Sequence, residues 1–184
     1  MHYQLFDPTN GSLTRLINSP VPRHDHSSAL LTPNGGVWVM GGNRVQLIEG
    51  ATPNTPEGRR LEDLAVPVLE FYKPPYFFKG VRPVIKETPR RIHYGQEFRI
   101  AVAEKSDDIA SVALLRTGPV THNWAWGNHY VKLPLAKEKK NEGRKDRLHI
   151  SAPPLPGLAP AGDYLLFVVN KQGVPSEGQH IRLE

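Results

Sequence analysis

Hydrophobic residues occur along this chain in short stretches between turn residues. Within these stretches they are not spaced every three to four positions, as they would be in an amphipathic helix. Near the N-terminus, the turn signals Asn10-Gly11 and Gly41-Gly42 bound such stretches. The segments that we expect to form strands there are residues 3–6, 12–17, 26–32 and 36–40. Four short strands ending at a Gly-Gly turn match the size of one β-propeller blade. Because a single blade cannot bury both of its faces, we expect further blades to cover it.

A polar, Pro-rich stretch, residues 51–60, separates this region from a second series of strand signals. The segments expected to form strands in the second series are residues 68–72, 96–102, 110–116, 130–135, 147–151, 164–170 and 180–183. About seven strands without helical periodicity are typical of an immunoglobulin-like β-sandwich. Residues 164–169 are apolar at every position, which indicates a central strand covered on both faces. We therefore predict an all-β chain with a propeller blade at 1–45, a linker at 46–67 and a sandwich at 68–184.

The composition agrees with a β-rich globular chain and excludes several kinds of site. Among 184 residues there are 16 Gly and 18 Pro, which favours many turns, and 39% are hydrophobic, which is enough for a core. The absence of cysteine excludes disulfides, thiolate metal sites and a cysteine nucleophile within this chain. No leader-like start is visible and the longest apolar run is too short to cross a bilayer, so we expect no membrane partner.

The net charge of +5 is a mild basic excess. Its densest part, residues 137–147, mixes basic with acidic residues and contains no aromatic residue. Nucleic-acid surfaces concentrate positive charge on one face, and those for single strands add aromatic stacking. We therefore interpret this stretch as a solvated hairpin tip and expect no nucleic-acid partner.

Histidines are the main candidates for chemistry. His26 either binds a metal or forms hydrogen bonds with its neighbours, and His122 follows a strand-ending Gly-Pro loop, a placement suited to a ligand. If His24 and His26 lie in a strand, they point to one face and could chelate Zn(II) or Ni(II) together with His122. The sequence alone leaves these alternatives open.

Two tryptophans at alternate positions, Trp124 and Trp126, follow His122. Aromatic rings in this arrangement can stack on a sugar or line the mouth of a substrate site. The alternative, which we favour, is that they cover the edge of the sandwich or pack against the propeller. No Ser-His-Asp arrangement and no phosphate-binding glycine loop is visible in the sequence.

Four segments of the chain carry a family resemblance: residues 3–42, 71–83, 114–122 and 162–176. The first of them contains the motif Arg23-His24-Asp25-His26-Ser27. In this order they resemble the C-terminal portion of the radical copper oxidases, the galactose oxidase and glyoxal oxidase group. The first segment resembles a kelch repeat. The others resemble the entry, the metal-ligand loop and the closing strands of the final domain. The resemblance implies a kelch-type blade followed by an early-set, immunoglobulin-like sandwich.

By this resemblance, one copper ion lies between propeller and sandwich, and His26 and His122 fall on the family's two histidine ligands. Asp25 falls on the position of the family's axial tyrosine, where it is a candidate third ligand or base. A carboxyl is about six pKa units more acidic than a phenol, so Asp25 is the weaker base. The family's cysteine-crosslinked tyrosine belongs to earlier blades that this chain does not contain, and we expect the chain alone to be inactive.

The leading hypothesis is the C-terminal part of a copper protein whose complete form oxidises an alcohol or aldehyde with O2 and produces H2O2. Its expected partners are the remaining propeller blades, in the same chain or in another, and a carbohydrate or small alcohol or aldehyde. The resemblance implies an extracellular location. The alternative is a non-catalytic module that docks on a propeller or a glycan and retains a vestigial metal site.

Overall fold

The computed structural model describes residues 2–7, 10–21, 23, 26–42, 65–121, 124–125, 127–135 and 146–184. The chain divides by its packing into two compact units. Unit 1 consists of Met1–Ala29, Trp38–Glu70 and Val120–Trp124, and unit 2 of Leu30–Val37, Phe71–Pro119 and Ala125–Glu184. Most of the expected linker at 46–67 lies outside the described residues, so the domain bounds inferred from the sequence stay a prediction.

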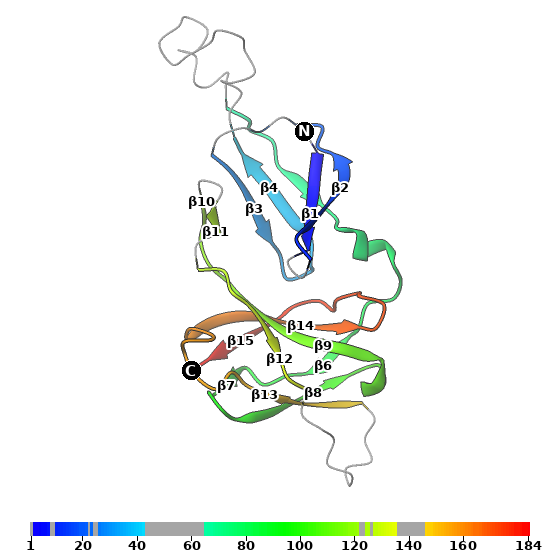
Figure 1. Ribbon diagram of the computed structural model, residues 1–184, viewed down its shortest axis with the longest axis vertical. Helices are drawn as coiled ribbons and strands as arrows, with labels where there is room; N and C mark the ends of the chain where they lie inside the picture. Colours follow the sequence, from blue (N-terminus) through cyan, green and yellow to red (C-terminus); the bar gives the residue numbers. More distant parts are fainter. Residues whose placement is uncertain are drawn as a thin grey trace, which may run out of the picture. The chain divides into compact units, whose positions relative to one another are not determined.

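The N-terminal hairpin joins β1 (His2–Asp7) to β2 (Ser12–Asn18), and the two strands pair antiparallel (Figure 1). The turn expected at Asn10-Gly11 is present: the Gly11 amide donates to the Asp7 carbonyl at 2.8 Å, and Gly11 has a φ of 71°. Asn10 Oδ1 accepts a hydrogen bond from the Ser12 amide at 2.9 Å. Local turn chemistry therefore sets the pairing of these two strands.

A second hairpin consists of β3 (Ser27–Leu31) and β4 (Val37–Gly41), and β5 (Glu70–Tyr72) extends it to a sheet of order β3-β4-β5. At its tip the Gly35 amide donates to the Thr32 carbonyl at 2.8 Å. The Gly36 amide donates to Asn34 Oδ1 at 2.9 Å. Gly35 has a φ of 81°, a conformation that favours glycine, so the Pro-Asn-Gly-Gly sequence forms the turn that its composition predicts.

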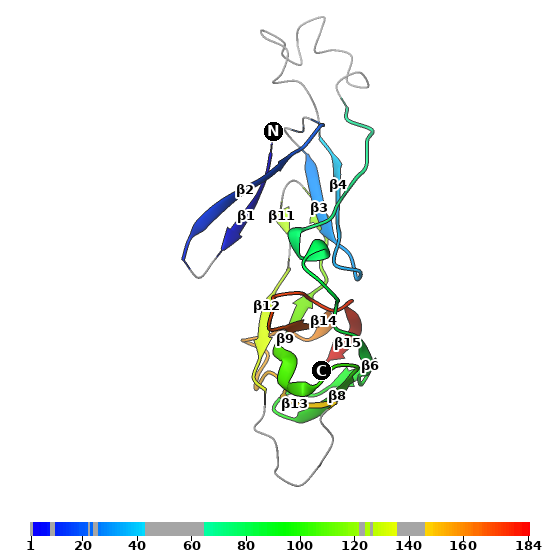
Figure 2. The same ribbon diagram turned by 90° about the vertical axis from the view of Figure 1, so that its right-hand side faces the viewer.

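Unit 2 contains two sheets that are stacked on each other (Figures 1 and 2). The larger has the order β12-β9-β14-β15-β7, with the bounds Tyr130–Leu133, Ile109–Arg116, Gly162–Asn170, Gln179–Leu183 and Arg91–Ile92. The smaller has the order β13-β8-β6, with the bounds Arg147–Ser151, Glu97–Val102 and Ile85–Glu87. A separate pair, β10 (Val120–Thr121) and β11 (Trp124–Ala125), follows β9 in the chain.

The hydrophobic core lies between these two sheets. Leu114 and Leu166 from the larger sheet and Ile100 and Ile150 from the smaller one are almost completely buried in one cluster. Each such side chain contributes about 1.5–3 kcal/mol by leaving water. Strand β14 pairs with β9 on one side and β15 on the other, and its residues 164–168 are all buried. The central strand expected from its continuous apolar run is therefore confirmed.

The tip of the second hairpin, residues 32–36, belongs to unit 2 and is held there by Arg82. The Arg82 guanidinium donates to the carbonyl oxygens of Asn34 at 2.6 Å, Pro175 at 2.9 Å and Ser176 at 2.6 Å. Asn34 lies in the tip, whereas Pro175 and Ser176 precede β15. One side chain therefore joins two backbone segments that are distant in the sequence.

Two aromatic side chains complete this attachment. The Tyr76 hydroxyl donates a hydrogen bond to the carbonyl of Gly35. The Phe71 ring lies against Gly36, where a Cβ atom would be 2.1 Å from the nearest ring carbon. Only glycine fits at position 36 without moving this ring.

The all-β class is confirmed for the described part of the chain, in which the only helical segments are the 3₁₀ turns η2 (Pro75–Phe78) and η3 (Ser106–Asp108). The apolar pattern does not predict β6 and β7, because each contains a single isoleucine among polar residues. No helix among the described residues is long and apolar enough to span a membrane. Residues 136–145, most of the expected basic hairpin tip, lie outside the described part.

Candidate metal site

Of the three candidate copper ligands, His26 is the one that the structure describes. His26 lies in a turn before β3, which begins at Ser27, so the expectation of a strand from residue 26 is wrong at this residue. Its φ of 57° is the only positive φ of a non-glycine residue in the described part of the chain. This left-handed conformation costs about 1–2 kcal/mol for an L-residue, so neighbouring groups must hold it. His26 is also exposed to solvent.

Gly41 packs directly against the backbone of His26. Gly41 has a φ of 68°, and a Cβ atom at this position would lie 2.7 Å from the carbonyl oxygen of His26. The atom that would be displaced belongs to the backbone and not to a flexible side chain. The Gly41-Gly42 turn therefore has a second role that its sequence does not reveal, because it allows close approach to His26.

Arg23, three residues before His26, is buried in unit 1. Its Nε donates to Glu70 Oε2 at 3.0 Å, and its Nη2 donates to the Val68 carbonyl at 2.6 Å. Its Nη1 donates to the Gly41 carbonyl. The side chains of Arg23 and Glu70 are 5% and 14% exposed, so this is a buried ion pair. Gly41 thus contacts both the Arg23 side chain and the His26 backbone.

Glu70 and its neighbours form a small polar cluster. The Ser19 hydroxyl lies 3.3 Å from Glu70 Oε1. Burial raises the pKa of Tyr3, and hydrogen bonding with Ser19 partly offsets that rise. Breaking one side of a buried ion pair typically costs about 3–5 kcal/mol, because the remaining charge has no partner.

The sequence carries no signal for Glu70. It lies 47 residues from Arg23 along the chain, and a single glutamate within an expected strand has no distinguishing pattern. Arg23 could have been identified, since it belongs to the segment that resembles a kelch repeat. Its structural partner becomes visible only after folding.

The loop that leads towards His122 starts from a fixed position in unit 2. The Arg116 amide, at the end of β9, donates to the His129 carbonyl at 2.8 Å. The amide and the hydroxyl of Thr117 donate to the Asp163 carbonyl at 3.2 and 3.1 Å. The strand-ending Gly-Pro loop expected from the sequence is therefore anchored at its start.

Several candidate residues lie outside the described part of the structure. These are His24, Asp25, His122 and Trp126, together with the side chain of Trp124, whose backbone begins β11. Within the described residues, no group of three or more His, Asp or Glu side chains is placed to hold a metal ion. The Zn(II) or Ni(II) alternative assumed that His24 and His26 share a strand, and the turn at His26 does not support that assumption.

The chemistry of the described donor fits one position of a copper site. Imidazole nitrogen suits Cu(II), and His26 is exposed, with its backbone packed against Gly41, whose carbonyl accepts from Arg23. Asp25 and His122, the other ligands expected from the family resemblance, lie outside the described part. Copper would supply one-electron redox chemistry at this position.

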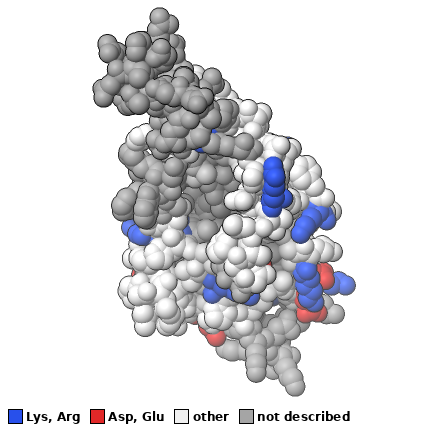
Figure 3. Space-filling model, turned by 45° about the horizontal axis from the view of Figure 1, so that its top comes forward, with Lys and Arg blue, Asp and Glu red and all other residues white. Residues whose placement is uncertain are grey.

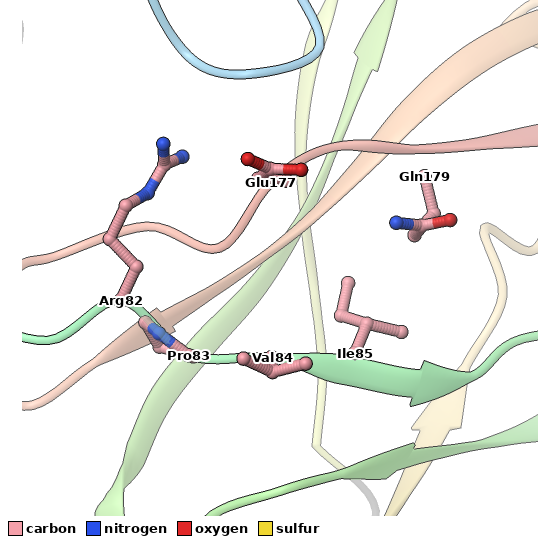
Figure 4. Close-up of a pocket in the computed structure, with 6 residues that line it drawn as sticks. All are labelled: Arg82, Pro83, Val84, Ile85, Glu177 and Gln179. Carbon is pink, nitrogen blue, oxygen red and sulfur yellow. The ribbon is translucent and has the colours of Figure 1, made fainter.

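The pockets of unit 2 do not contain an obvious catalytic arrangement. One, with a volume of about 190 Å³, is shown in Figure 4 and is lined by Arg82, Pro83, Val84, Ile85, Glu177 and Gln179. The Arg82 guanidinium already donates to three carbonyl oxygens, and Glu177 is the one acidic residue of the lining. A smaller pocket of about 70 Å³ lies beside the start of the loop, with Arg116 as its one charged residue. Neither lining offers paired groups for acid–base catalysis.

Charge is dispersed on the described face that Figure 3 draws. In the face drawn in Figure 3, basic side chains are separated by neutral and acidic ones and do not merge into one patch. Ion pairs such as Arg91–Glu184 at 3.1 Å and Arg182–Asp163 at 3.2 Å are exposed. Pairs of this kind contribute little to stability, and they neutralise part of the basic excess locally.

Comparison with known proteins relates this chain to oxidases. The family model described as galactose oxidase-like, early set domain, matches residues 82–183. The aldehyde oxidase GLOX of Vitis pseudoreticulata is 30% identical over 186 residues, and the match covers 98% of this chain and 34% of that protein. The aldehyde oxidase GLOX1 of Arabidopsis thaliana is 30% identical over 190 residues, covering 98% of this chain and 29% of that protein.

A solved structure shows the same relation. It is a fungal alcohol oxidase with catalytic diversity among the AA5 family, in complex with copper. The TM-score is 0.76 with 25% sequence identity, and the match covers 98% of this chain and 35% of that chain. The present chain therefore spans between 29% and 35% of the length of these relatives.

These matches confirm the resemblance inferred from the sequence motifs, and they relate the chain to aldehyde and alcohol oxidases. The early-set part of the all-β fold is likewise confirmed. The strands β1 to β4 are consistent with the kelch-type repeat expected from the sequence, but the family match at 82–183 does not extend to them. The family model matches residues 82–183, which is more than half of the 184 residues. This chain therefore belongs to the galactose oxidase-like early set domain family.

Proposed function

We propose that this chain supplies part of the copper site of an oxidase. In this proposal His26 and His122 bind the metal, and Asp25 is a third ligand or the base that accepts a proton from the substrate. The complete protein oxidises an alcohol or an aldehyde with O2 and releases H2O2. The roles of His122 and Asp25 rest on family resemblance, because both lie outside the described residues.

The observation that carries the proposal is the conformation of His26. It is an exposed imidazole on a left-handed residue, with a φ of 57°, next to a buried ion pair that fixes the surrounding backbone. Strained residues of this kind cluster at functional sites. The likeness to an alcohol oxidase in complex with copper supports copper over the other metals that imidazole binds.

The electron balance indicates what the rest of the protein must provide. Oxidation of an alcohol to an aldehyde removes two electrons and two protons, and O2 takes up both to become H2O2. Copper changes by one electron between Cu(II) and Cu(I), so a second one-electron centre is required. A cysteine-crosslinked tyrosine cannot form within this chain, which has no cysteine. That centre therefore belongs to a part of the complete protein that this chain does not include.

Within this chain, Asp25 is the group proposed to accept the proton. As a carboxylate it is a weaker base than the tyrosinate expected at its position. We therefore expect slow turnover from the complete protein with substrates whose hydroxyl is weakly acidic. Substrates with a more acidic hydroxyl, such as a hydrated aldehyde, suit this base better. The proposed substrate class accordingly leans towards aldehydes, as in the names of the two plant relatives.

The N-terminal hairpin exposes apolar side chains on both of its faces. Phe6 and Leu13 pair across β1 and β2 and are 58% and 60% exposed. Leu5, on the opposite face of β1, is 52% exposed. Apolar side chains exposed on both faces of one hairpin are typical of an interaction surface. We propose that neighbouring propeller blades, in the same chain or in another, cover this hairpin.

The same surface supports a second candidate function. A non-catalytic module that docks on a propeller also needs exposed apolar side chains on its N-terminal hairpin, and it does not need a working base at Asp25. The two candidates differ in copper binding, which the first requires and the second does not.

A calorimetric Cu(II) titration of the purified chain separates them. We expect one tightly bound copper in the wild type and loss of this binding in the His26→Ala, His122→Ala double variant. A matched control, His93→Ala with His180→Ala, removes two exposed histidines elsewhere and should retain the binding. Copper binding that is the same in all three proteins would overturn the copper proposal and favour the docking module.

A further inference from the structure

A chain of direct contacts runs from Glu70 to His26. Glu70 Oε2 accepts from Arg23 Nε at 3.0 Å, and Arg23 Nη1 donates to the Gly41 carbonyl. Gly41 in turn lies against the His26 carbonyl, where a Cβ atom would be 2.7 Å from the oxygen. All four residues belong to unit 1. The buried carboxylate and the strained histidine are therefore two ends of one packed arrangement.

We propose that Glu70 is a positioning residue for the metal ligand His26. Through Arg23 and Gly41 it holds His26 in the left-handed conformation and thereby sets the affinity and geometry of metal binding. This inference rests on the proposed function, because it takes His26 as a ligand. Glu70 itself contacts neither metal nor substrate.

The charge of Glu70 matters because its partner is buried. The Arg23 side chain is 5% exposed, so its charge depends on the carboxylate and on the carbonyl oxygens around it. Without the carboxylate, the guanidinium is expected to move towards water. Its hydrogen bond to the Gly41 carbonyl then weakens, and the backbone at His26 loses the contact that maintains its φ.

The position of Arg23 also explains why this effect reaches the ligand. Arg23 precedes His26 by three residues in the sequence, and its Nη1 donates to the Gly41 carbonyl. Gly41 in turn lies against the His26 carbonyl. Partners beyond the metal ligands that restrain a ligand in this way usually increase metal affinity.

The test is a Cu(II) titration with EPR on the full chain carrying Glu70→Gln, which keeps the shape of the side chain and removes its charge. We expect Cu(II) affinity to fall by about tenfold or more and the copper hyperfine splitting to change. The control is Glu87→Gln, which makes the same change of net charge at an exposed position in β6 and should behave as wild type. Glu70→Asp, which keeps the carboxylate, should recover part of the affinity.

Circular dichroism establishes that each variant is folded before titration. If Glu70→Gln does not fold, Ser19→Ala replaces it, because this milder change removes only the hydroxyl 3.3 Å from Glu70 Oε1. A smaller loss of affinity than for Glu70→Gln is then expected, again with an altered hyperfine splitting.

The outcomes separate this inference from the proposed function. If His26→Ala weakens copper binding and Glu70→Gln or Ser19→Ala behaves like Glu87→Gln, the positioning role is overturned and the copper proposal stands. If His26→Ala leaves copper binding unchanged, both are overturned. Loss of affinity in Glu70→Gln together with a larger loss of affinity in His26→Ala supports both.

Discussion

Gly41 and His26 are in closer contact than any residue with a side chain would allow: a Cβ atom at position 41 would lie 2.7 Å from the His26 carbonyl oxygen. Gly41 ends β4 and His26 immediately precedes β3, so the contact closes the open end of this hairpin. It joins a strained histidine to a backbone that the buried Arg23 also contacts. The stability of this arrangement and its proposed role in metal binding can be tested separately.

Replacing Gly41 by alanine is expected to be strongly destabilising. Its φ of 68° is unfavourable for alanine, and the new Cβ pushes against the His26 backbone. Together these effects should lower the free energy of unfolding by about 3 kcal/mol in urea denaturation. Gly11→Ala is the control: Gly11 has a similar φ of 71° but open space around it, so about 1–2 kcal/mol is expected. Equal losses in the two variants would contradict the close contact.

Replacing His26 by glycine is expected to increase stability. Glycine adopts a φ of 57° without strain, so the free energy of unfolding should rise by about 1 kcal/mol. His26→Ala, which also lacks the imidazole but keeps the strain, should show no such gain. Urea denaturation of the two variants without metal measures the difference. If both variants are equally stable, the left-handed conformation of His26 is not strained.

Replacing Arg82 by lysine is expected to weaken the attachment of the hairpin tip within unit 2. The single ammonium group of a lysine cannot donate to the carbonyl oxygens of Asn34, Pro175 and Ser176 at once, as the planar guanidinium does. The expected loss is about 2–4 kcal/mol, since hydrogen bonds from charged groups are among the stronger ones. Arg91→Lys, at a 65% exposed ion pair with Glu184, should cost less than about 0.5 kcal/mol. Similar losses in thermal unfolding would argue against a special role for Arg82.

Stability is expected to fall in alkaline solution because of Tyr164. Burial raises the pKa of this tyrosine, although the nearby Arg116 opposes the rise, and its hydroxyl donates to the Pro160 carbonyl at 2.5 Å. The unfolded chain ionises its tyrosine near pH 10.0, before the folded chain does, so the folded state loses stability as the pH rises above that value.

Tyr164→Phe tests this dependence. Below pH 10 the variant should be less stable by about 1 kcal/mol, because it lacks the hydrogen bond to Pro160. Above pH 10 its urea midpoint should fall less steeply than that of the wild type. Parallel pH profiles for the two proteins would show that Tyr164 does not contribute to the alkaline loss.

Most strands of the fold follow from local pattern. The continuous apolar run at 164–169 predicts a strand covered on both faces, and β14 is such a strand. The Asn10-Gly11 dipeptide predicts a hairpin turn, and its φ and hydrogen bonds agree. Hydrophobic alternation and turn chemistry act over a few residues, which is why a single sequence reveals them.

The candidate site is less predictable because its contacts are long-range. Alternation along the chain predicts His26 as a strand residue, whereas its contact with Gly41 places it in a left-handed turn. The pairing of Arg23 with Glu70 joins residues 47 positions apart and has no local signature. The attachment of the hairpin tip to Arg82 is of the same kind. The family motif indicates His26 as a ligand, but only folding shows which residues hold it.

The number of histidine nitrogens bound to copper tests the central claim most directly. Pulsed EPR of the copper-loaded chain measures this number through the coupling of the remote imidazole nitrogens. We predict two coupled imidazoles in the wild type and one in each of the single variants His26→Ala and His122→Ala. A spectrum that is unchanged by either substitution would contradict the claim that these two histidines share one copper ion.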